Sequence, residues 1–244
     1  MAGSKVIISV NNLVKNYGNF EAEKGIRFEV YVNEVFGLLG PNGAGKSTTL
    51  EIIETLREKT QGTIMVDGID LDRHPQEIKK IIGVQLQTSG FYPNLNLVEL
   101  IELFAGLYNR SEKPMELLDR VNLRDKAKAK VKELSGGQKQ RFSIATTLIN
   151  DPKIIFLDEP TTGLDPQARR NLWDLIRQIQ QRDTTVIITT HYMDEAEYCN
   201  RISMMVDGSI EALDTPSALK QKYKAASMDE VFRELARKAV RAAD

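Results

Sequence analysis

The amino-acid sequence predicts an α/β fold whose central sheet is mostly parallel, with an antiparallel β subdomain near the N-terminus and an inserted helical subdomain. Three runs rich in Val, Ile and Leu, at residues 35–39, 154–157 and 186–190, are typical of strands covered on both faces. Residues 25–32 instead alternate apolar and polar side chains, which predicts a half-exposed strand of an antiparallel sheet. Residues 95–149 carry no strong strand pattern and are expected to be mostly helical.

Further elements complete this outline along the chain. Residues 6–10 are expected to form the first strand, and residues 63–66, followed by an Asp-Gly turn, another strand of the antiparallel sheet. A helix is predicted at residues 47–56. Another is predicted at residues 167–182, where Leu and Ile recur on one helical face.

The domain organisation follows from the positions of these patterns. We expect one main domain at residues 1–225, with the helical subdomain, at about residues 88–149, inserted into its core. Residues 226–244 are predicted to form a C-terminal amphipathic helix, because apolar side chains recur there with helical spacing.

The overall composition is that of an ordinary globular protein and argues against several classes. The 244 residues include 33 Lys and Arg against 34 Asp and Glu, and this net charge of -1 gives no support to nucleic-acid binding. The single cysteine, Cys199, cannot form an internal disulfide, which favours a reducing compartment, and we expect it to be buried. The first residues are too polar for a signal peptide, and no apolar run approaches the roughly 20 residues of a spanning helix. We therefore expect a cytoplasmic protein.

A glycine-rich segment between the strand at residues 35–39 and the helix at residues 47–56 has the pattern of a phosphate-binding loop, or P-loop. Its glycines let backbone N–H groups turn towards phosphate oxygens, and the helix N-terminus adds further donors. Lys46 would neutralise the β- and γ-phosphates of a nucleotide, and the Ser47 hydroxyl would bind Mg²⁺. The central sheet is thus predicted to be that of a P-loop NTPase. The nucleotide-binding residues predicted here are Gly40, Pro41, Asn42, Gly43, Ala44, Gly45, Lys46, Ser47 and Thr48.

A P-loop alone leaves kinases, GTPases, helicases and transport ATPases open, and the end of the strand at residues 154–157 narrows this choice. Two carboxylates, Asp158 and Glu159, follow that strand at the sheet edge where ligands bind in open α/β folds. Asp158 would hold Mg²⁺ through water, and Glu159 would orient and polarise the attacking water as a catalytic base. Joined to the P-loop, the two carboxylates indicate nucleotide hydrolysis.

The octapeptide at residues 134–141, Leu-Ser-Gly-Gly-Gln-Lys-Gln-Arg, is a second helix start able to bind an anion. It resembles the signature sequence of the ATP-binding-cassette (ABC) family, and the resemblance extends over about residues 5–225. In that family two ATP molecules are held between head-to-tail cassettes. The resemblance therefore implies a homodimer or paired cassette, in which Ser135, Gly136 and Gly137 contact ATP bound to the partner subunit.

The resemblance also assigns roles to two residues outside these motifs. Tyr17 lies where an aromatic residue of the family stacks on adenine. Gln87 ends a segment that matches the family's glutamine loop, which implies contact with Mg²⁺ and water. Gln85 is a near neighbour that could be mistaken for it.

Two further segments match motifs of the family and follow the other motifs in the same order along the chain. His191 follows the strand at residues 186–190 as the family's switch histidine does, and would hydrogen-bond the γ-phosphate and hold the catalytic geometry. The Gly-Leu-Asp segment at residues 163–165 matches the loop that crosses the dimer interface in the family.

One turn departs from the family pattern. The turn before the strand at residues 35–39 usually carries glycine, but here it reads Tyr31-Val32-Asn33. Because asparagine tolerates left-handed backbone geometry, we expect the turn to survive. The catalytic motifs are intact, which predicts an active ATPase.

Three segments, at residues 36–41, 190–197 and 228–232, resemble the branch of the family that exports drugs, polysaccharides or lipids. This implies an ATPase that uses ATP and Mg²⁺ to drive a separate transmembrane permease subunit, located peripherally on the inner face of the cell membrane. The loop at residues 91–93 would help to receive the permease.

Two other functions are weighed against transport. A soluble ABC protein acting on DNA, ribosomes or cluster assembly would be indicated by long coiled coils or a second cassette, and the sequence has neither. A P-loop kinase of small molecules is contradicted by the signature octapeptide and by the position of Glu159. The transported substrate is left open.

Overall fold

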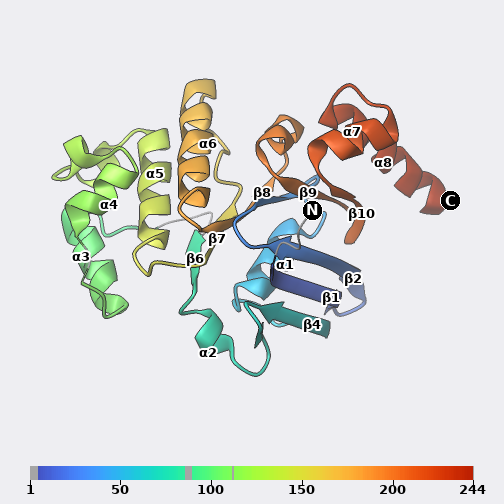
Figure 1. The fold of residues 1–244 in the computed structure, drawn as a ribbon, viewed down its shortest axis with the longest axis horizontal. Coiled ribbons are helices and arrows are strands. Elements are labelled where there is room, and N and C mark those ends of the chain that lie inside the picture. The colour runs from blue at the N-terminus through green and yellow to red at the C-terminus, as the bar shows by residue number, and fades with distance from the viewer. Residues whose placement is uncertain (1–4, 86–89, 112, 244) are drawn as a thin grey trace.

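The structure, a computed structural model, describes residues 5–85, 90–111 and 113–243, with side chains described as far as residue 237. Two β-sheets form its centre, and helices lie around them (Figure 1). The arrangement confirms the predicted α/β fold with one mostly parallel and one antiparallel sheet.

The larger sheet of the described chain contains six strands. These are β3 (Val35–Leu39), β6 (Ile82–Gln85), β7 (Ile154–Asp158), β8 (Thr185–Thr190), β9 (Arg201–Val206) and β10 (Ser209–Asp214). Their order is β10-β9-β3-β8-β7-β6, and the pairs are parallel except for β9 with β10. As a result, the carboxyl ends of β3, β7 and β8 meet at one edge of the sheet.

The smaller sheet is antiparallel, and its strands in the order β2-β1-β4-β5 are β2 (Phe20–Tyr31), β1 (Val6–Tyr17), β4 (Gln61–Val66) and β5 (Ile69–Asp70). Both β1 and β2 are longer than predicted, because register shifts let their pairing continue past irregular positions. Asn12 and Gly25 adopt positive φ angles of 53° and 76°, and a Cβ atom at Gly25 would lie 2.9 Å from Asn12 Oδ1. The glycine that marks a strand start in the sequence is therefore a bulge inside a longer strand.

Alternate residues of the central strands contribute to two separate hydrophobic cores. On β3, Phe36 and Leu38 belong to the core shared with the antiparallel sheet, whereas Val35 and Leu39 belong to the core beneath the other helices. Strands β7 and β8 alternate in the same way. Both faces of these strands are buried, which explains why their sequences are apolar without interruption.

Helices cover both sides of this arrangement. The helix after the P-loop, α1 (Lys46–Ile53), places Leu50, Ile52 and Ile53 in the core between the two sheets. The short helix α2 (Pro75–Ile78) follows β5. Figure 1 shows the next three helices grouped at one end of the molecule, with α6 (Pro166–Gln180) beside them. They are α3 (Leu97–Leu107), α4 (Pro114–Arg120) and α5 (Gly136–Thr147).

Shorter 3-10 helices and two C-terminal helices complete the fold. The 3-10 helices are η1 (Arg124–Lys126), η2 (Val131–Glu133) and η3 (Met193–Tyr198). The helices α7 (Pro216–Tyr223) and α8 (Met228–Ala243) pack together at the end of the molecule opposite α3 and α4 (Figure 1). Val231 and Leu235 of α8 are buried in the same core as Cys199, whose predicted burial is confirmed. In the described residues, we find no helix of the length and apolar character needed to span a membrane.

Polar residues shape two of the connections next to the parallel sheet. Asn33 has φ 62° and donates its backbone N–H to Thr185 Oγ1 at 2.9 Å, so the turn that lacks the expected glycine is formed by asparagine in a left-handed conformation, as predicted. Asp165 caps the N-terminus of α6, and its side chain accepts hydrogen bonds from the N–H groups of Gln167 and Ala168 at 2.9 and 2.8 Å.

Candidate functional site

The P-loop connects β3 to α1, and its backbone depends on glycine. Gly43 and Gly45 have φ angles of 82° and 103°, in the region that side chains rarely adopt. Gly40 is required for a different reason, because a Cβ atom there would lie 2.3 Å from the carbonyl oxygen of Met205 on β9. The loop is therefore held between the end of β3, strand β9 and the first turn of α1.

Lys46, the first residue of α1, is almost completely buried and folds back over the loop. Its Nζ atom donates to the carbonyl oxygens of Gly40 and Pro41 at 2.9 and 3.1 Å. The same atom lies 3.5 Å from Glu159 Oε1. The ammonium group thus lies inside the curve of the loop, where it can meet phosphate oxygens.

Ser47 and Asp158 form the second part of the site. Ser47 Oγ lies 3.2 and 3.1 Å from the two carboxylate oxygens of Asp158 at the end of β7. Thr189 on β8 donates from its hydroxyl to Asp158 Oδ1 and accepts the backbone N–H of Glu159 at 2.9 Å. A hydroxyl beside a carboxylate fits Mg²⁺, which is bound through oxygen atoms and commonly shared with phosphates and water.

Glu159 occupies the centre of the site and has an unusual backbone. Its φ angle is 45°, a left-handed conformation that is uncommon outside glycine and clusters at functional sites. Oε2 of Glu159 lies 3.2 Å from Nδ1 of His191, and the Thr162 hydroxyl donates to the same oxygen at 3.4 Å. Glu159 therefore joins Lys46 on one side to His191 on the other.

Burial changes the charge of a carboxyl group behind this site. The pKa of Glu54, at the end of α1, is raised to about 8, first by burial and then by the negative charges of Asp158 and Glu51. Glu54 therefore carries a proton at neutral pH.

Lys46, Ser47 and Glu159 border a pocket of about 540 Å³ beside the P-loop. Its wall consists of Tyr17, Phe20, Ala22, Asn42, Gly43, Gly45, Lys46, Ser47, Thr48 and Glu159. Tyr17 borders the pocket, and its hydroxyl accepts a hydrogen bond from Arg57 at 2.5 Å. Its stacking on adenine stays a prediction. Phe20 is a second, highly exposed aromatic residue in the same wall, which the sequence analysis did not single out.

The second predicted helix end lies at the start of α5. Ser135 accepts the backbone N–H of Gln138 at 3.3 Å, and the Gln138 side chain accepts the N–H of Ser135 at 2.9 Å. Gly137 packs against α6, where a Cβ atom would lie 2.9 Å from that of Ala168. Ser135 and Gly137 border a separate pocket of about 210 Å³, whose wall shares no residue with the pocket at the P-loop.

Gln87 lies outside the described residues, so its predicted contact with Mg²⁺ stays a prediction. Its neighbour Gln85 is described, as the buried last residue of β6, paired in register with Leu157.

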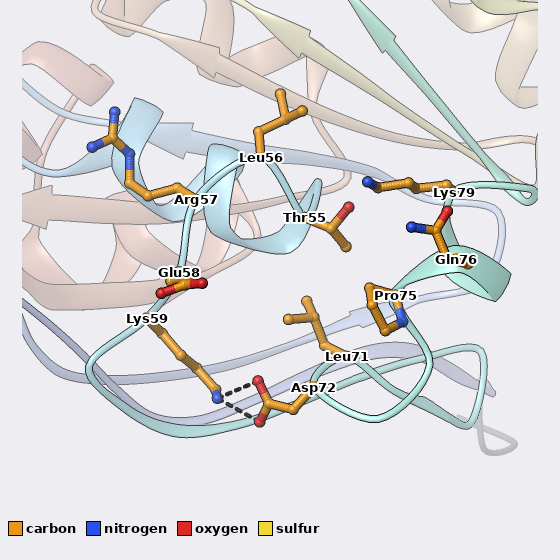
Figure 2. Close-up of a pocket in the computed structure, with 10 residues that line it drawn as sticks. All are labelled: Thr55, Leu56, Arg57, Glu58, Lys59, Leu71, Asp72, Pro75, Gln76 and Lys79. Atoms are coloured by element: carbon orange, nitrogen blue, oxygen red, sulfur yellow. Dashed lines mark hydrogen bonds and ion pairs between the residues drawn. The ribbon is translucent and has the colours of Figure 1, made fainter.

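A further pocket, of about 570 Å³, lies beyond the C-terminal end of α1 and is drawn in Figure 2. Lys59 and Asp72 form an ion pair across its lower rim, while Leu71 and Pro75 give it an apolar wall. It contains none of the predicted site residues. We assign the site to the smaller pocket, because the P-loop, Lys46, Ser47 and Glu159 form its wall.

Comparison with known proteins relates the chain to one protein family. Residues 24–162 match the protein family described as ABC transporter. The chain is 38% identical over 231 residues to Nod factor export ATP-binding protein I of Burkholderia orbicola, covering 92% of this chain and 76% of the relative. It is also 38% identical over 221 residues to the "Probable multidrug ABC transporter ATP-binding protein YbhF" of Escherichia coli. That match covers 88% of this chain but 38% of YbhF, so the chain spans well under half of the length of this relative.

Solved structures show the same fold. An ATP-binding subunit of an ABC transporter superposes with a TM-score of 0.82 at 28% identity, over 94% of this chain and 99% of the other. The cassette MJ0796, dimeric in a post-hydrolysis state with ADP and Pi bound, superposes with a TM-score of 0.76 at 29% identity, over 85% of this chain and 98% of the other.

Proposed function

The chain belongs to the ABC transporter family, and on that premise we propose that it binds and hydrolyses ATP to drive a separate membrane subunit. The observation that carries the proposal is the meeting of Lys46, Ser47, Asp158, Glu159 and His191 at one edge of the parallel sheet. These groups supply what hydrolysis of a phosphoanhydride requires, namely a cationic phosphate site, oxygen ligands and a base beside the loop.

ATP binding uses the P-loop and its flanking residues. Lys46 would leave the carbonyl oxygens of Gly40 and Pro41 and turn to the β- and γ-phosphates. Backbone N–H groups of the loop and of the first turn of α1 would hold the remaining phosphate oxygens. Tyr17 would stack on the adenine ring, with Phe20 beside it in the pocket wall.

Ser47 and Asp158 would hold Mg²⁺, with Gln87 as a further proposed contact. The bound ion would neutralise charge that develops on the phosphates during hydrolysis. The hydroxyl of Thr189 keeps Asp158 oriented towards Ser47.

Hydrolysis would begin at Glu159. Its carboxylate would accept a hydrogen bond from the attacking water and increase the nucleophilicity of that water. His191, 3.2 Å from Glu159, would hydrogen-bond the γ-phosphate and keep the base and the phosphate in a fixed relation. Transfer of the γ-phosphoryl group to water would then leave ADP and inorganic phosphate.

Two copies of the chain would form the complete catalytic unit. The helix end at Ser135, Gly136 and Gly137 borders a different pocket from the P-loop of the same chain, which supports a role in a partner's site. A solved cassette of this fold is dimeric. We therefore propose a head-to-tail dimer in which the loop at residues 163–165 crosses the interface.

The membrane partner is proposed from the relatives. Their names describe ATP-binding proteins for multidrug transport and for Nod factor export. We propose that this chain acts at the inner face of the cell membrane on a permease subunit that exports its substrate. The main domain would span residues 1–225, with the inserted helical subdomain at about residues 88–149, and residues 226–244 would form an appended amphipathic helix.

Co-purification tests the transport function. The chain should remain bound to a membrane subunit encoded beside its gene after detergent extraction, and its ATPase rate should change when that subunit is reconstituted in lipid. If the chain never associates with such a subunit, the transport function is wrong. Strong stimulation of the ATPase by nucleic acid or by ribosomes would favour a soluble ABC protein instead.

A further inference from the structure

Glu23 lies directly behind the P-loop, although it belongs to none of the motifs discussed above. It is part of β2, and its side chain is fully buried against the start of α1. A Cβ atom at Gly45 would lie 2.4 Å from Glu23 Oε1 and 3.1 Å from Oε2. The carboxyl group therefore occupies the space that the absence of a side chain at Gly45 leaves open.

The two carboxyl oxygens have different environments. Oε1 accepts a hydrogen bond from the hydroxyl of Thr49, one turn into α1, at 3.0 Å. Oε2 is fully enclosed and has no hydrogen-bond partner among the described residues. Leaving one oxygen of a buried group without a partner costs far more for an ionised carboxylate than for a neutral carboxyl group, so this arrangement favours the neutral form.

The charged groups around Glu23 are directed elsewhere. Lys24, the next residue of β2, pairs with Asp207 in the β9–β10 turn, and Lys15 on β1 donates to the carbonyl oxygen of Glu58. On α1, Lys46 is directed to the P-loop carbonyl groups and to Glu159, and Glu51 pairs with Arg57. The charged groups that act on Glu54, at the end of α1, are Asp158 and Glu51, which raise its pKa together with burial. Among the ion pairs of the described residues, none includes Glu23.

The pKa of Glu23 agrees with these contacts. Burial raises it from 4.5 to about 8, and the hydrogen bond from Thr49 lowers it by a smaller amount. At neutral pH the group therefore carries its proton, and it loses that proton within a pH range in which the protein can be studied.

We propose that Glu23 is a positioning residue of the P-loop, which supports Gly45 and Thr49 in its neutral form and weakens nucleotide binding when it loses its proton. The proposal rests on the proposed binding of ATP at this loop. An ionised carboxylate behind Gly45 would repel the phosphates on the other side of the loop and would attract the backbone N–H groups that bind them.

Binding of Mg-ADP as a function of pH tests this inference, since ADP occupies the P-loop without turnover. The dissociation constant would be measured by calorimetry at pH 7 and pH 9 for the wild-type chain and for Glu23→Gln, whose amide keeps the shape of the neutral carboxyl group. Because the pKa of Glu23 is about 8, the group loses most of its proton between pH 7 and pH 9. The dissociation constant of the wild-type chain should therefore increase by up to about tenfold over this range, beyond any increase in Glu23→Gln. The ionisation of ADP affects both proteins equally and cancels in the comparison.

Thr49→Val provides a second variant. It removes the hydrogen bond that lowers the pKa of Glu23, so the fall in affinity should move to higher pH. If the wild-type chain and Glu23→Gln bind Mg-ADP with the same pH dependence, the inference is wrong while nucleotide binding stands. If neither protein binds Mg-ADP at any pH, the proposed function fails together with the inference.

Discussion

The Oε2 atom of Glu159 lies 3.2 Å from Nδ1 of His191, so the proposed base is in direct contact with the proposed γ-phosphate ligand. The other carboxylate oxygen of Glu159 lies 3.5 Å from Lys46 Nζ. A single carboxylate thus links the cationic group of the P-loop to the end of β8. Substitutions at these positions should separate binding of ATP from its hydrolysis.

Glu159→Gln should bind ATP and hydrolyse it about 10²- to 10⁴-fold more slowly, because the amide cannot act as the base for water. The same variant should accumulate as an ATP-bound dimer, detected by size-exclusion chromatography with and without ATP. Glu197→Gln is the matched control, because Glu197 pairs with Lys220 on the surface and should leave the rate unchanged. A rate near that of the wild type in Glu159→Gln would exclude this residue as the base.

Lys46→Ala should lose nucleotide binding, with an affinity at least about 100-fold lower, since each charge-assisted hydrogen bond contributes about 1.5–3 kcal/mol. Calorimetric titration with ATP and Mg²⁺ measures the effect. Lys24→Ala removes a nearby ammonium group that pairs with Asp207, and it should bind ATP as the wild type does. Equal loss of affinity in both variants would indicate a general effect of charge rather than a contact with the phosphates.

Thr189→Val should reduce the rate of hydrolysis about 10- to 100-fold, because a small displacement of catalytic groups has effects of that size. The Thr189 hydroxyl contacts both Asp158 and the backbone of Glu159, and valine can replace neither contact. Thr185→Val removes a hydroxyl from the start of the same strand, where it accepts the N–H of Asn33. The control should lose stability without a comparable loss of turnover, and identical effects on turnover would contradict the role given to Thr189.

Glu23 should make the stability of the protein depend on pH. Its pKa is about 8 in the folded chain and 4.5 as its ordinary value, so between these values the unfolded chain loses a proton that the folded chain retains. The free energy of unfolding of the wild type should therefore fall, relative to Glu23→Gln, by up to about 1.4 kcal/mol for each pH unit in this window. Urea denaturation of both proteins at pH 5, 6.5 and 8 measures the difference. A difference that does not change with pH would show that Glu23 has an ordinary pKa.

The sequence predicts those strands whose burial produces a simple order of apolar and polar residues along the chain. Strands β3, β7 and β8 bury both faces, so each is an uninterrupted apolar run. Strands β6, β9 and β10 were not predicted. Strand β6 has four residues and was interpreted as part of a loop motif, and the pairing of β9 with β3 joins segments far apart in the chain, which local periodicity does not encode.

The residues of the site also fall into two groups, those that the sequence identifies and those that only the structure reveals. P-loop chemistry requires fixed residue types at fixed spacing, so Lys46 and Ser47 could be identified directly from the sequence. Thr189 and Glu23 lie in ordinary strands, and their roles arise from contacts with residues 31 and 26 positions away in the chain. Such contacts become visible only when the strands and α1 are placed in space.

Complementation between two inactive variants tests the shared site most directly. Lys46→Ala removes the phosphate contact of one chain, and Ser135→Arg blocks the helix end that would serve the partner. Each variant alone should be inactive. In an equal mixture, random pairing places one complete site in half of the dimers, so about a quarter of the wild-type ATPase rate should appear. A mixture that stays inactive, although both chains are folded, would contradict the proposal that the P-loop of one copy works with Ser135 of the other.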